Sequence, residues 1–503
     1  MVAKTMKGLE AVLADELRNM GALNVQPGHR MVSFEGNIET LYRANLCLRT
    51  ALRILKPFYS FTANNPDTLY DRLKEFDWNS VMTPDSTFAI DMVMFSDTFT
   101  HSRFATYRVK DAIVDWFRDR YDRRPNVRLN DADVMINVHI QGDQVTLSLD
   151  SSGESLHKRG WRVATTEAPI NEVLAAGILL IAGYDGSQPL VDPMCGSGTF
   201  LVEAALIAAN INPGVFRRKY AFQNWPDYDE QLFESLWDND SAEREPQNII
   251  MGADMLRSAV DATQRNLRAA GVSKYVSVEV RKLSEWKEAP AQQGIIVTNP
   301  PYGTRISAPD MEELYALIGR QLKNLFTGWN AWIISLKDEY FHSIGLATSE
   351  KISLLNGSLE CELREYVMFA GNKKEFRASG GRLKKEKNDT PRSAKTAANR
   401  NAALKRIRED GKKNGSPEKK KSEKPFGRAN KRLNSKPESD LSEKPFRRRT
   451  EETTPISMTA ADSENPLAAR RNVNALKSIL NREPSLPKSD GPIMRSRGWK
   501  KKS

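Results

Sequence analysis

The sequence predicts an α/β fold whose largest domain is a doubly wound, mostly parallel sheet. A short apolar strand at residues 189–192 is followed by a glycine-containing turn and by a strong helical pattern at residues 199–209. Two further apolar strands cover residues 249–254 and 293–298, and helical patterns separate them. Alternation of strand and helix is typical of such sheets, which bind ligands at the carboxyl ends of their strands.

The turn after the first strand contains Gly196 and Gly198 in the run Asp-Pro-Met-Cys-Gly-Ser-Gly-Thr. Glycine is expected where a ligand approaches the backbone, because a side chain would hold the ligand away. The spacing is not GxGxxG, so a pyrophosphate ligand is less favoured. Asp192 ends the strand before the turn, as suits a cationic or hydroxyl-rich ligand. An ordinary tight turn is the alternative interpretation of the glycine pair.

The strand at residues 293–298 ends in Asn299-Pro300-Pro301-Tyr302. The two prolines remove two N–H donors and stiffen the backbone. The Asn299 side-chain oxygen and the Pro300 carbonyl then offer two acceptors near one point, and Tyr302 adds a flat ring. Two acceptors and a stacking ring suit a planar base with an exocyclic amino group. A rigid proline turn without further function is the alternative.

The runs Asp-Pro-Met-Cys-Gly-Ser-Gly-Thr and Asn-Pro-Pro-Tyr-Gly resemble the cofactor and catalytic motifs of S-adenosylmethionine-dependent amino methyltransferases. The whole layout most resembles the THUMP-domain RNA guanine-N2 methyltransferases, which include bacterial large-subunit ribosomal RNA enzymes. The resemblance implies a class I (Rossmann-like) methyltransferase domain preceded by a ferredoxin-like and THUMP α+β module that binds RNA. It also implies S-adenosyl-L-methionine as the cofactor.

On this basis we expect four regions. Residues 1–58 form a ferredoxin-like domain, residues 59–160 the THUMP domain, residues 161–371 the methyltransferase domain, and residues 372–503 a disordered tail rich in Lys and Arg. Hydrophobic periodicity in the first two regions predicts these elements: helices at residues 6–20, 38–46, 69–76 and 103–121, and strands at residues 24–25, 31–34, 50–59, 87–94, 134–140 and 144–149.

The resemblance also assigns residues that hold the cofactor. Asp254 ends the strand at residues 249–254, where a carboxylate can accept two ribose hydroxyls; a role at the start of the next helix is the alternative. Asn171 lies in the run Ala168-Pro169-Ile170-Asn171-Glu172, which starts a helix and resembles the family's segment that packs beside the cofactor. The full set of expected cofactor residues is Asp192, Met194, Gly196, Ser197, Gly198, Thr199, Asp254 and Asn171.

Two features of the methyltransferase region depart from a simple pattern. Relatives have an acid after the strand at residues 276–280, whereas this chain has Arg281-Lys282-Leu283-Ser284-Glu285, so the acid is missing or displaced to Glu285. Basic and aromatic residues alternate in an insertion at residues 212–247. Such interleaving suits a platform for single-stranded nucleic acid, and aromatic packing of an irregular segment is the alternative.

Basic residues of the first half are the candidates for RNA contacts. Arg103 and Arg108 belong to the most basic helix, although interspersed acids make an ordinary solvated helix face an equal alternative. His157, Lys158 and Arg159 lie in a junction that resembles the family's connection between the THUMP and methyltransferase domains. The resemblance favours contacts between these residues and RNA phosphates. Without the resemblance, the junction would be interpreted as a linker.

The charge and composition of the chain limit the partners and cofactors that we expect. The chain has a net charge of +11, of which about +21 belongs to residues 371–503, leaving about −10 for residues 1–370. A basic tail adds salt-dependent attraction to RNA. The three cysteines and five histidines match no metal spacing, so no metal site is expected. We find no signal peptide and no apolar run that would cross a bilayer, so we expect a cytoplasmic protein with no membrane partner.

The expected activity is methyl transfer to the exocyclic N2 of a guanine in RNA, with Asn299, Pro300, Pro301 and Tyr302 as the catalytic residues. Ribosomal 23S RNA is the first choice of substrate, and transfer RNA is the alternative. The catalytic motif suits the amino group of adenine as well as that of guanine. Adenine-N6 methylation of RNA or DNA is therefore an alternative activity. A non-catalytic RNA-binding factor in ribosome assembly is the alternative of another class.

Overall fold

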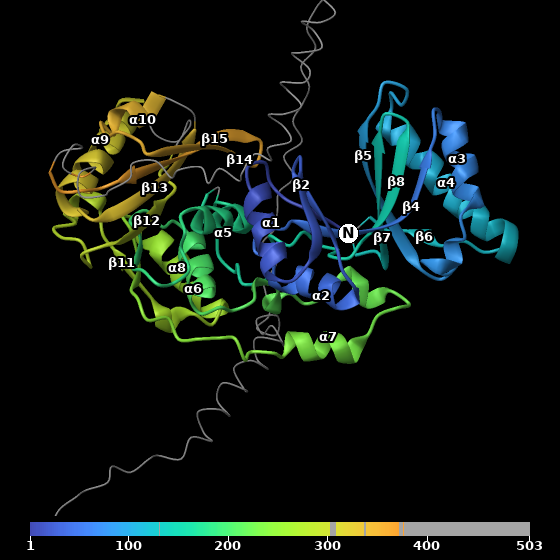
Figure 1. Cartoon of the computed structure of the whole chain (residues 1–503), viewed down its shortest axis with the longest axis horizontal. Helices are drawn as coiled ribbons and strands as arrows, with labels where there is room; N and C mark the ends of the chain where they lie inside the picture. The colour runs from blue at the N-terminus through green and yellow to red at the C-terminus, as the bar shows by residue number, and fades with distance from the viewer. Residues whose placement is uncertain (130, 168, 302–307, 337–338, 372–375, 377–503) are drawn as a thin grey trace, which may run out of the picture. The chain divides into compact units, whose positions relative to one another are not determined.

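The computed structural model describes residues 1–129, 131–167, 169–301, 308–336, 339–371 and 376. Within them the chain forms one eight-stranded and one seven-stranded sheet. Figure 1 labels their strands. Tyr302 and, apart from Phe376, the predicted tail at residues 372–503 lie outside the described residues. None of the described helices combines the length and apolar composition needed to cross a bilayer.

The first sheet has the strand order β2-β3-β1-β4-β8-β7-β5-β6. The ferredoxin-like and THUMP regions share this sheet because the long strand β4 pairs with β1 on one side and with β8 on the other. Its elements are β1 (Val2–Lys4), α1 (Glu10–Asn19), β2 (Leu23–Gly28), β3 (Met31–Glu35), α2 (Ile38–Cys47), β4 (Arg53–Thr62), α3 (Pro66–Glu75), β5 (Thr87–Phe95), α4 (Ser102–Tyr121), β6 (Asn126–Val127), β7 (Val134–Gln141) and β8 (Gln144–Asp150).

Local sequence signals explain where these helices begin and which face they bury. The Asn37 side chain accepts a hydrogen bond from the Thr40 amide at 3.0 Å, which caps α2. In α4, Val109, Ile113 and Phe117 recur every four residues and are fully buried. That spacing places one apolar stripe against the sheet and leaves the basic residues of the helix toward solvent.

The second sheet has the order β11-β10-β9-β12-β13-β15-β14, in which β11 to β13 are parallel and β15 is antiparallel to both neighbours. Its elements are α5 (Glu172–Ile181), β9 (Leu190–Asp192), α6 (Thr199–Ala208), α7 (Glu230–Trp237), β10 (Ile250–Asp254), α8 (Arg257–Ala269), β11 (Val276–Val280), β12 (Gly294–Thr298), α9 (Ala308–Leu325), β13 (Trp329–Leu336), α10 (Glu339–Ser343), β14 (Glu350–Asn356) and β15 (Leu359–Val367).

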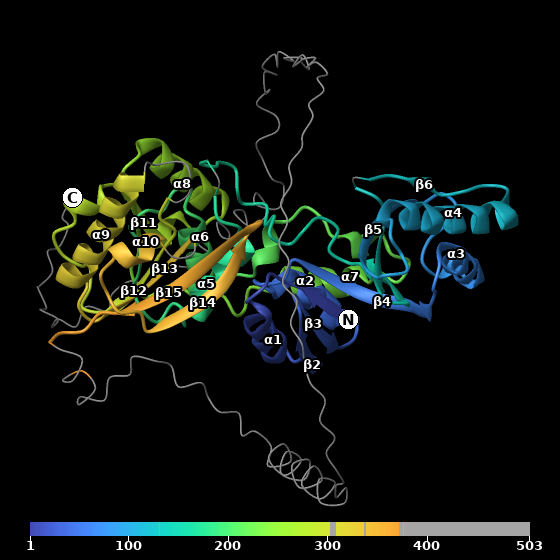
Figure 2. The same cartoon turned by 90° about the horizontal axis from the view of Figure 1, so that it is seen from above.

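Helices cover both faces of this sheet, with α5, α6 and α8 on one face and α9 and α10 on the other (Figure 1 and Figure 2). Along β12, Ile295 and Val297 join the core beneath α5 and α6, whereas Ile296 joins the core beneath α9. Side chains of a strand alternate between faces, so a strand buried on both sides reads as a continuous apolar run. The predicted doubly wound α/β fold is confirmed.

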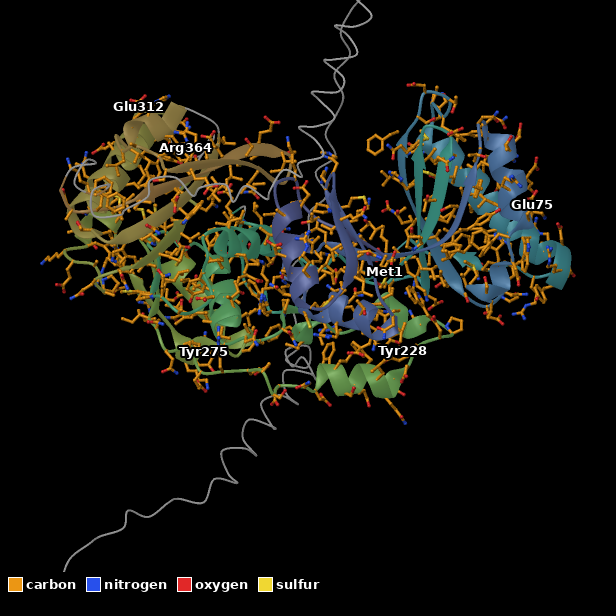
Figure 3. All side chains as sticks on the ribbon, viewed as in Figure 1. Met1, Glu75, Tyr228, Tyr275, Glu312 and Arg364 are labelled. Atoms are coloured by element: carbon orange, nitrogen blue, oxygen red, sulfur yellow. The ribbon has the colours of Figure 1, made fainter. Side chains whose placement is uncertain are left out.

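The insertion at residues 212–247 packs its aromatic residues inward. Phe222 and Phe233 are buried, and the Phe222 ring stacks on Tyr42 of α2 with 4.6 Å between ring centroids. Tyr228, labelled in Figure 3, lies with its ring centroid 6.1 Å from that of Tyr42. Arg217 is also buried and donates hydrogen bonds to backbone carbonyls. Of the two interpretations of this insertion, aromatic packing is therefore correct.

Candidate active site

The candidate site lies where the carboxyl ends of β9, β10 and β12 meet. Strand β9 stands between the other two, with Gly252 of β10 opposite Asp192 and Ile296 of β12 opposite Val191. The chain runs from β9 outward to β11 and then returns past β9 to β12, so the strand order reverses beside β9. Ligands of doubly wound sheets bind at such a reversal.

The glycine loop, residues 195–198, follows β9 and depends on two left-handed glycines. Gly196 has φ +55° and Gly198 has φ +78°, values that side chains disfavour. A Cβ atom on Gly198 would lie 2.5 Å from Cγ2 of Thr263. Around a Cβ atom on Gly196, by contrast, Oγ1 of Thr166 at 3.6 Å is the only heavy atom of another described residue, its chain neighbours aside, that would lie within 4 Å. Gly198 therefore serves packing, and Gly196 leaves the backbone open to a ligand.

Asp254 at the end of β10 connects its strand to the glycine loop. One carboxylate oxygen accepts the Gly196 amide at 3.0 Å, and the other accepts the Leu256 amide at 2.9 Å. Each carboxylate oxygen has a second lone pair, and the residue is half-exposed. Asp254 can therefore accept two ligand hydroxyls while its orientation stays fixed. The residue at the N-terminal cap of α8 is Leu256, not Asp254.

An apolar surface beside Asp254 was not predicted from the sequence. Val280 is opposite Asp254 in the register of β10 and β11, and its exposed fraction is 44%. Met255 and Leu256 follow Asp254 directly and are 62% and 56% exposed. Exposed apolar side chains next to a carboxylate that can accept further hydrogen bonds suit a nucleoside, which has a flat ring and ribose hydroxyls. The signal in the sequence is the pair of apolar residues immediately after the acid that ends the strand.

Glu285, to which the acid expected after β11 was thought to be displaced, takes part in a short turn of its own. One Glu285 carboxylate oxygen accepts the Lys282 amide at 3.1 Å, within its own short turn. The Arg281 side chain pairs with Glu279 at 3.0 Å and lies over the Trp286 ring. Glu285 thus stabilises the turn after β11, and the exposed apolar residues are the stronger candidates for contact with a base.

Asp192 ends β9 inside the protein, with an exposed fraction of 1%. The Met194 amide donates to its Oδ1 atom at 3.2 Å. Burial raises the pKa of Asp192 from 3.8 to about 7 because a charged carboxylate loses its hydration there. A carboxylate with this pKa changes its charge near neutral pH, and a cationic ligand would favour its ionised form.

Asn299 follows β12 and carries the most informative atom of the site. Its Oδ1 atom is buried and has no hydrogen-bond partner among the residues that the structure describes. Pro300 beside it is buried, and Pro301 is half-buried. A buried amide oxygen without a partner costs about 1–3 kcal/mol, and such an atom calls for an explanation. A ligand N–H donor supplies one.

Three other expected cofactor residues make hydrogen bonds within the protein. The Asn171 side chain caps α5 by accepting the Val173 amide at 2.9 Å and the Leu174 amide at 3.4 Å. Ser197 and Thr199 are buried, and their hydroxyls accept hydrogen bonds from Arg162. Arg162 was not among the residues predicted from the sequence. Within the described ranges, no group of three or more His, Cys, Asp or Glu side chains is arranged to hold a metal ion.

One expected RNA contact is wrong. The Arg159 side chain is buried, with an exposed fraction of 2%, because it pairs with Glu203 of α6 at 3.3 Å. A guanidinium enclosed in this way cannot reach a phosphate in solvent. Its neighbours stay accessible: Lys158 is exposed and pairs with Glu154, and His157 is half-buried beside Ser155.

The two arginines on α4 also differ. Arg103 is exposed on the first turn of the helix. Arg108 donates to Asp67 at 2.9 Å and lies 4.4 Å from the centroid of the Tyr70 ring, so part of its charge is engaged within the domain. Arg103 is thus the better placed of the two for a phosphate.

Comparisons with known proteins agree with this geometry. A model of the RMKL-like methyltransferase domain matches residues 159–365. A model of the RlmL ferredoxin-like domain matches residues 1–55, and a THUMP-domain model matches residues 63–150. The ferredoxin-like and THUMP matches fall on the part of the chain that forms the first sheet, and the methyltransferase match falls on the part that forms the second sheet.

Individual relatives cover the same part of the chain. The Ribosomal RNA large subunit methyltransferase K/L of Syntrophotalea carbinolica is 41% identical over 72% of this chain, which spans only 53% of that relative. A Synechocystis protein named as an RNA methyltransferase, slr0064, is 40% identical over 73% of this chain and 96% of its own length.

A solved structure shows the same architecture. The crystal structure of SMU.472, described as a methyltransferase complexed with SAH, matches with a TM-score of 0.66 and 31% identity. The match covers 74% of this chain and 98% of that one. The chain therefore belongs to the family of RMKL-like methyltransferases, in an arrangement in which an RlmL ferredoxin-like domain and a THUMP domain precede the methyltransferase domain.

Proposed function

We propose that this protein transfers a methyl group from S-adenosyl-L-methionine to the exocyclic N2 of a guanine in RNA, with 23S ribosomal RNA as the substrate. The observation that carries the proposal is the Oδ1 atom of Asn299, which follows β12 and is buried with no hydrogen-bond partner among the described residues. The names of the relatives support an RNA substrate. The chain spans about half the length of the K/L relative.

The residues around the glycine loop fit the cofactor. Asp254 offers free lone pairs to the ribose hydroxyls, and Met255 with Val280 offers an apolar surface to the adenine. The loop from Met194 to Thr199 presents its backbone toward the rest of the cofactor, and Asp192 favours a positive charge nearby. Bound there, S-adenosyl-L-methionine supplies a methyl group on a sulfonium, and the protein supplies orientation.

Asn299 and Pro300 would act on the nucleophile. The amino nitrogen of guanine is a poor nucleophile because its lone pair is delocalised into the ring. Hydrogen bonds from this amino group to Asn299 Oδ1 and to the Pro300 carbonyl would favour a pyramidal nitrogen with its lone pair directed at the methyl group. Alignment and preorganised acceptors would then provide most of the rate enhancement.

Pro301 and Tyr302 would complete the base-binding site. Pro301 restricts the backbone after the acceptors, and Tyr302 is proposed to stack on the base. A target base within a helix must first leave its stack, at a cost of a few kcal/mol. No general base is required if the proton leaves after methyl transfer.

RNA would be held by the THUMP domain and by the junction that follows it. Arg103, Arg108, His157 and Lys158 are the proposed contacts, because each keeps some exposure. Arg159 is excluded by its burial. Such contacts fix the position of the RNA and make its affinity dependent on salt.

Adenine-N6 methylation is the second candidate, because the free acceptor of Asn299 fits the adenine amino group equally well. To decide between the two, the purified protein is incubated with labelled S-adenosyl-L-methionine and unmodified 23S RNA, transfer RNA or DNA, and the products are digested to nucleosides. The proposal predicts labelled N2-methylguanosine from 23S RNA. Label in N6-methyladenosine, or in guanosine of transfer RNA alone, would overturn the choice of base or of RNA respectively.

A further inference from the structure

Arg162 connects three separate parts of the methyltransferase domain. It lies in the segment that precedes α5, and its side chain is only 20% exposed. Its Nη1 atom donates to the Ser197 hydroxyl at 3.1 Å and its Nη2 atom to the Thr199 hydroxyl at 2.9 Å. Its Nε atom donates to Glu172 of α5 at 2.6 Å. The guanidinium therefore joins the start of α5 to both ends of the turn that contains Gly198.

A second side chain attaches the same segment to the same loop. Asn266 of α8 is fully buried, and its Oδ1 atom accepts the amides of Val163 and Ala164, each at 2.9 Å. Its Nδ2 atom donates to the Ala164 carbonyl at 2.8 Å and to the Ser197 carbonyl at 2.9 Å. All four hydrogen-bonding positions of this amide are used. The segment from Arg162 to Ala164 is thus tied to Ser197 through both its side chain and its backbone.

We propose that Arg162 is a positioning residue that holds the glycine loop in the conformation that accepts the cofactor. The inference rests on the proposed function for the identity of that cofactor. A loop with two glycines loses more conformational entropy on ordering than other loops. Fixing the hydroxyls on either side of Gly198 before the cofactor arrives removes part of this cost from binding, which is how preorganisation raises affinity.

The arrangement needs arginine rather than a positive charge alone. The planar guanidinium presents donors in fixed directions, and here they reach Glu172, Ser197 and Thr199 at once. A lysine ammonium is a point charge on a flexible chain and cannot reproduce three diverging hydrogen bonds. Arg162→Lys therefore keeps the charge and removes the geometry.

Arg217 provides a matched control. It is a buried arginine that donates to four backbone carbonyls, those of residues 152, 154, 155 and 158, and none of these four belongs to the glycine loop. Arg217→Lys should lower the thermal midpoint to a similar extent as Arg162→Lys. Only Arg162→Lys should change the properties of the glycine loop.

The full chain is titrated with S-adenosylhomocysteine by calorimetry. We expect Arg162→Lys to raise the Kd about tenfold, equivalent to the loss of about 1.4 kcal/mol, and Arg217→Lys to leave it within about twofold. Glu172→Gln keeps the shape of the side chain but weakens its hydrogen bond to Arg162 Nε, so it should raise the Kd severalfold. This second variant tests the inference if Arg162→Lys does not fold. In turnover, the KM for the cofactor should rise with the Kd, and kcat at saturation should stay within about threefold.

A readout without cofactor tests the conformational part directly. Hydrogen exchange of the amides at residues 196–199 should accelerate in Arg162→Lys and not in Arg217→Lys. Equal Kd values for Arg162→Lys and wild type, or equal weakening by both variants, would overturn the inference alone. Failure of the wild-type protein to bind S-adenosylhomocysteine would overturn the proposed function and the inference with it.

Discussion

Replacing Asn299 by alanine should separate catalysis from cofactor binding. The substitution removes the acceptor Oδ1 and leaves Asp254 and the glycine loop, which lie on other strands, unchanged. Loss of one preorganised hydrogen-bonding group at a reacting centre lowers kcat by about 100- to 1,000-fold, or about 3–4 kcal/mol. We therefore expect kcat to fall by that factor and the Kd for S-adenosylhomocysteine to stay within about twofold.

The same variant should not be less stable than the wild type. A buried polar atom without a partner costs about 1–3 kcal/mol, and Asn299 Oδ1 has none within the part of the chain that the structure describes. Alanine removes this cost but also loses some packing, so the free energy of unfolding should be unchanged or higher by about 1 kcal/mol. A large loss of activity without a loss of stability is the expected signature.

Single-turnover rates at saturating cofactor measure kcat, calorimetry measures the Kd, and urea unfolding measures stability. Ser349→Ala is a suitable control because the Ser349 hydroxyl, just before β14, is also buried and has no hydrogen-bond partner in the described ranges. This control should match the stability change and keep full activity. An Asn299→Ala variant that retains kcat, or that loses cofactor affinity as strongly as activity, would refute the reasoning.

Three further predictions concern the strand ends and the loop. Asp192 has a pKa of about 7 in the folded protein against 3.8 as the reference, so between pH 4 and 7 the folded form holds a proton that the unfolded chain has lost. The free energy of unfolding should fall as pH rises through this window, by up to about 4 kcal/mol, and Asp192→Asn should abolish the fall. If the urea midpoints of wild type and Asp192→Asn change with pH in the same way, this prediction is wrong. Gly198→Ala should destabilise more than Gly183→Ala in thermal melts, because both have positive φ but only the first meets a neighbour, Thr263 at 2.5 Å; equal losses would exclude the clash. Asp254→Asn should weaken cofactor binding about 10- to 100-fold, because a charged hydrogen bond contributes about 1.5–3 kcal/mol; calorimetry showing an unchanged Kd would remove Asp254 from the site.

The positions of the strands that carry the site could be predicted from the sequence, because these strands are short apolar runs followed by distinctive residues. Residues 276–280 were predicted as a strand and form β11 with the same limits, and residues 293–298 contain β12. The continuous first sheet was not foreseen. It depends on the pairing of β4 with β8, which are about ninety positions apart, and local periodicity carries no information about such pairing. The three-residue strand β1 was too short to show a pattern.

Burial of charged residues was the part that sequence alone could not provide. Arg159 and Arg162 stand three positions apart in one basic junction, and nothing local distinguishes them from Lys158. Their roles are set by partners far along the chain, Glu203 for Arg159 and the glycine loop for Arg162. A buried arginine needs a specific partner to offset the loss of hydration, and only the fold reveals which arginines have one.

The most direct test of the central claim is nucleoside mass spectrometry of ribosomal and transfer RNA from cells with and without the gene. The proposed function predicts that N2-methylguanosine decreases in large-subunit ribosomal RNA when the gene is absent and returns with the wild-type gene but not with Asn299→Ala. Unchanged N2-methylguanosine together with a loss of N6-methyladenosine would contradict the choice of guanine.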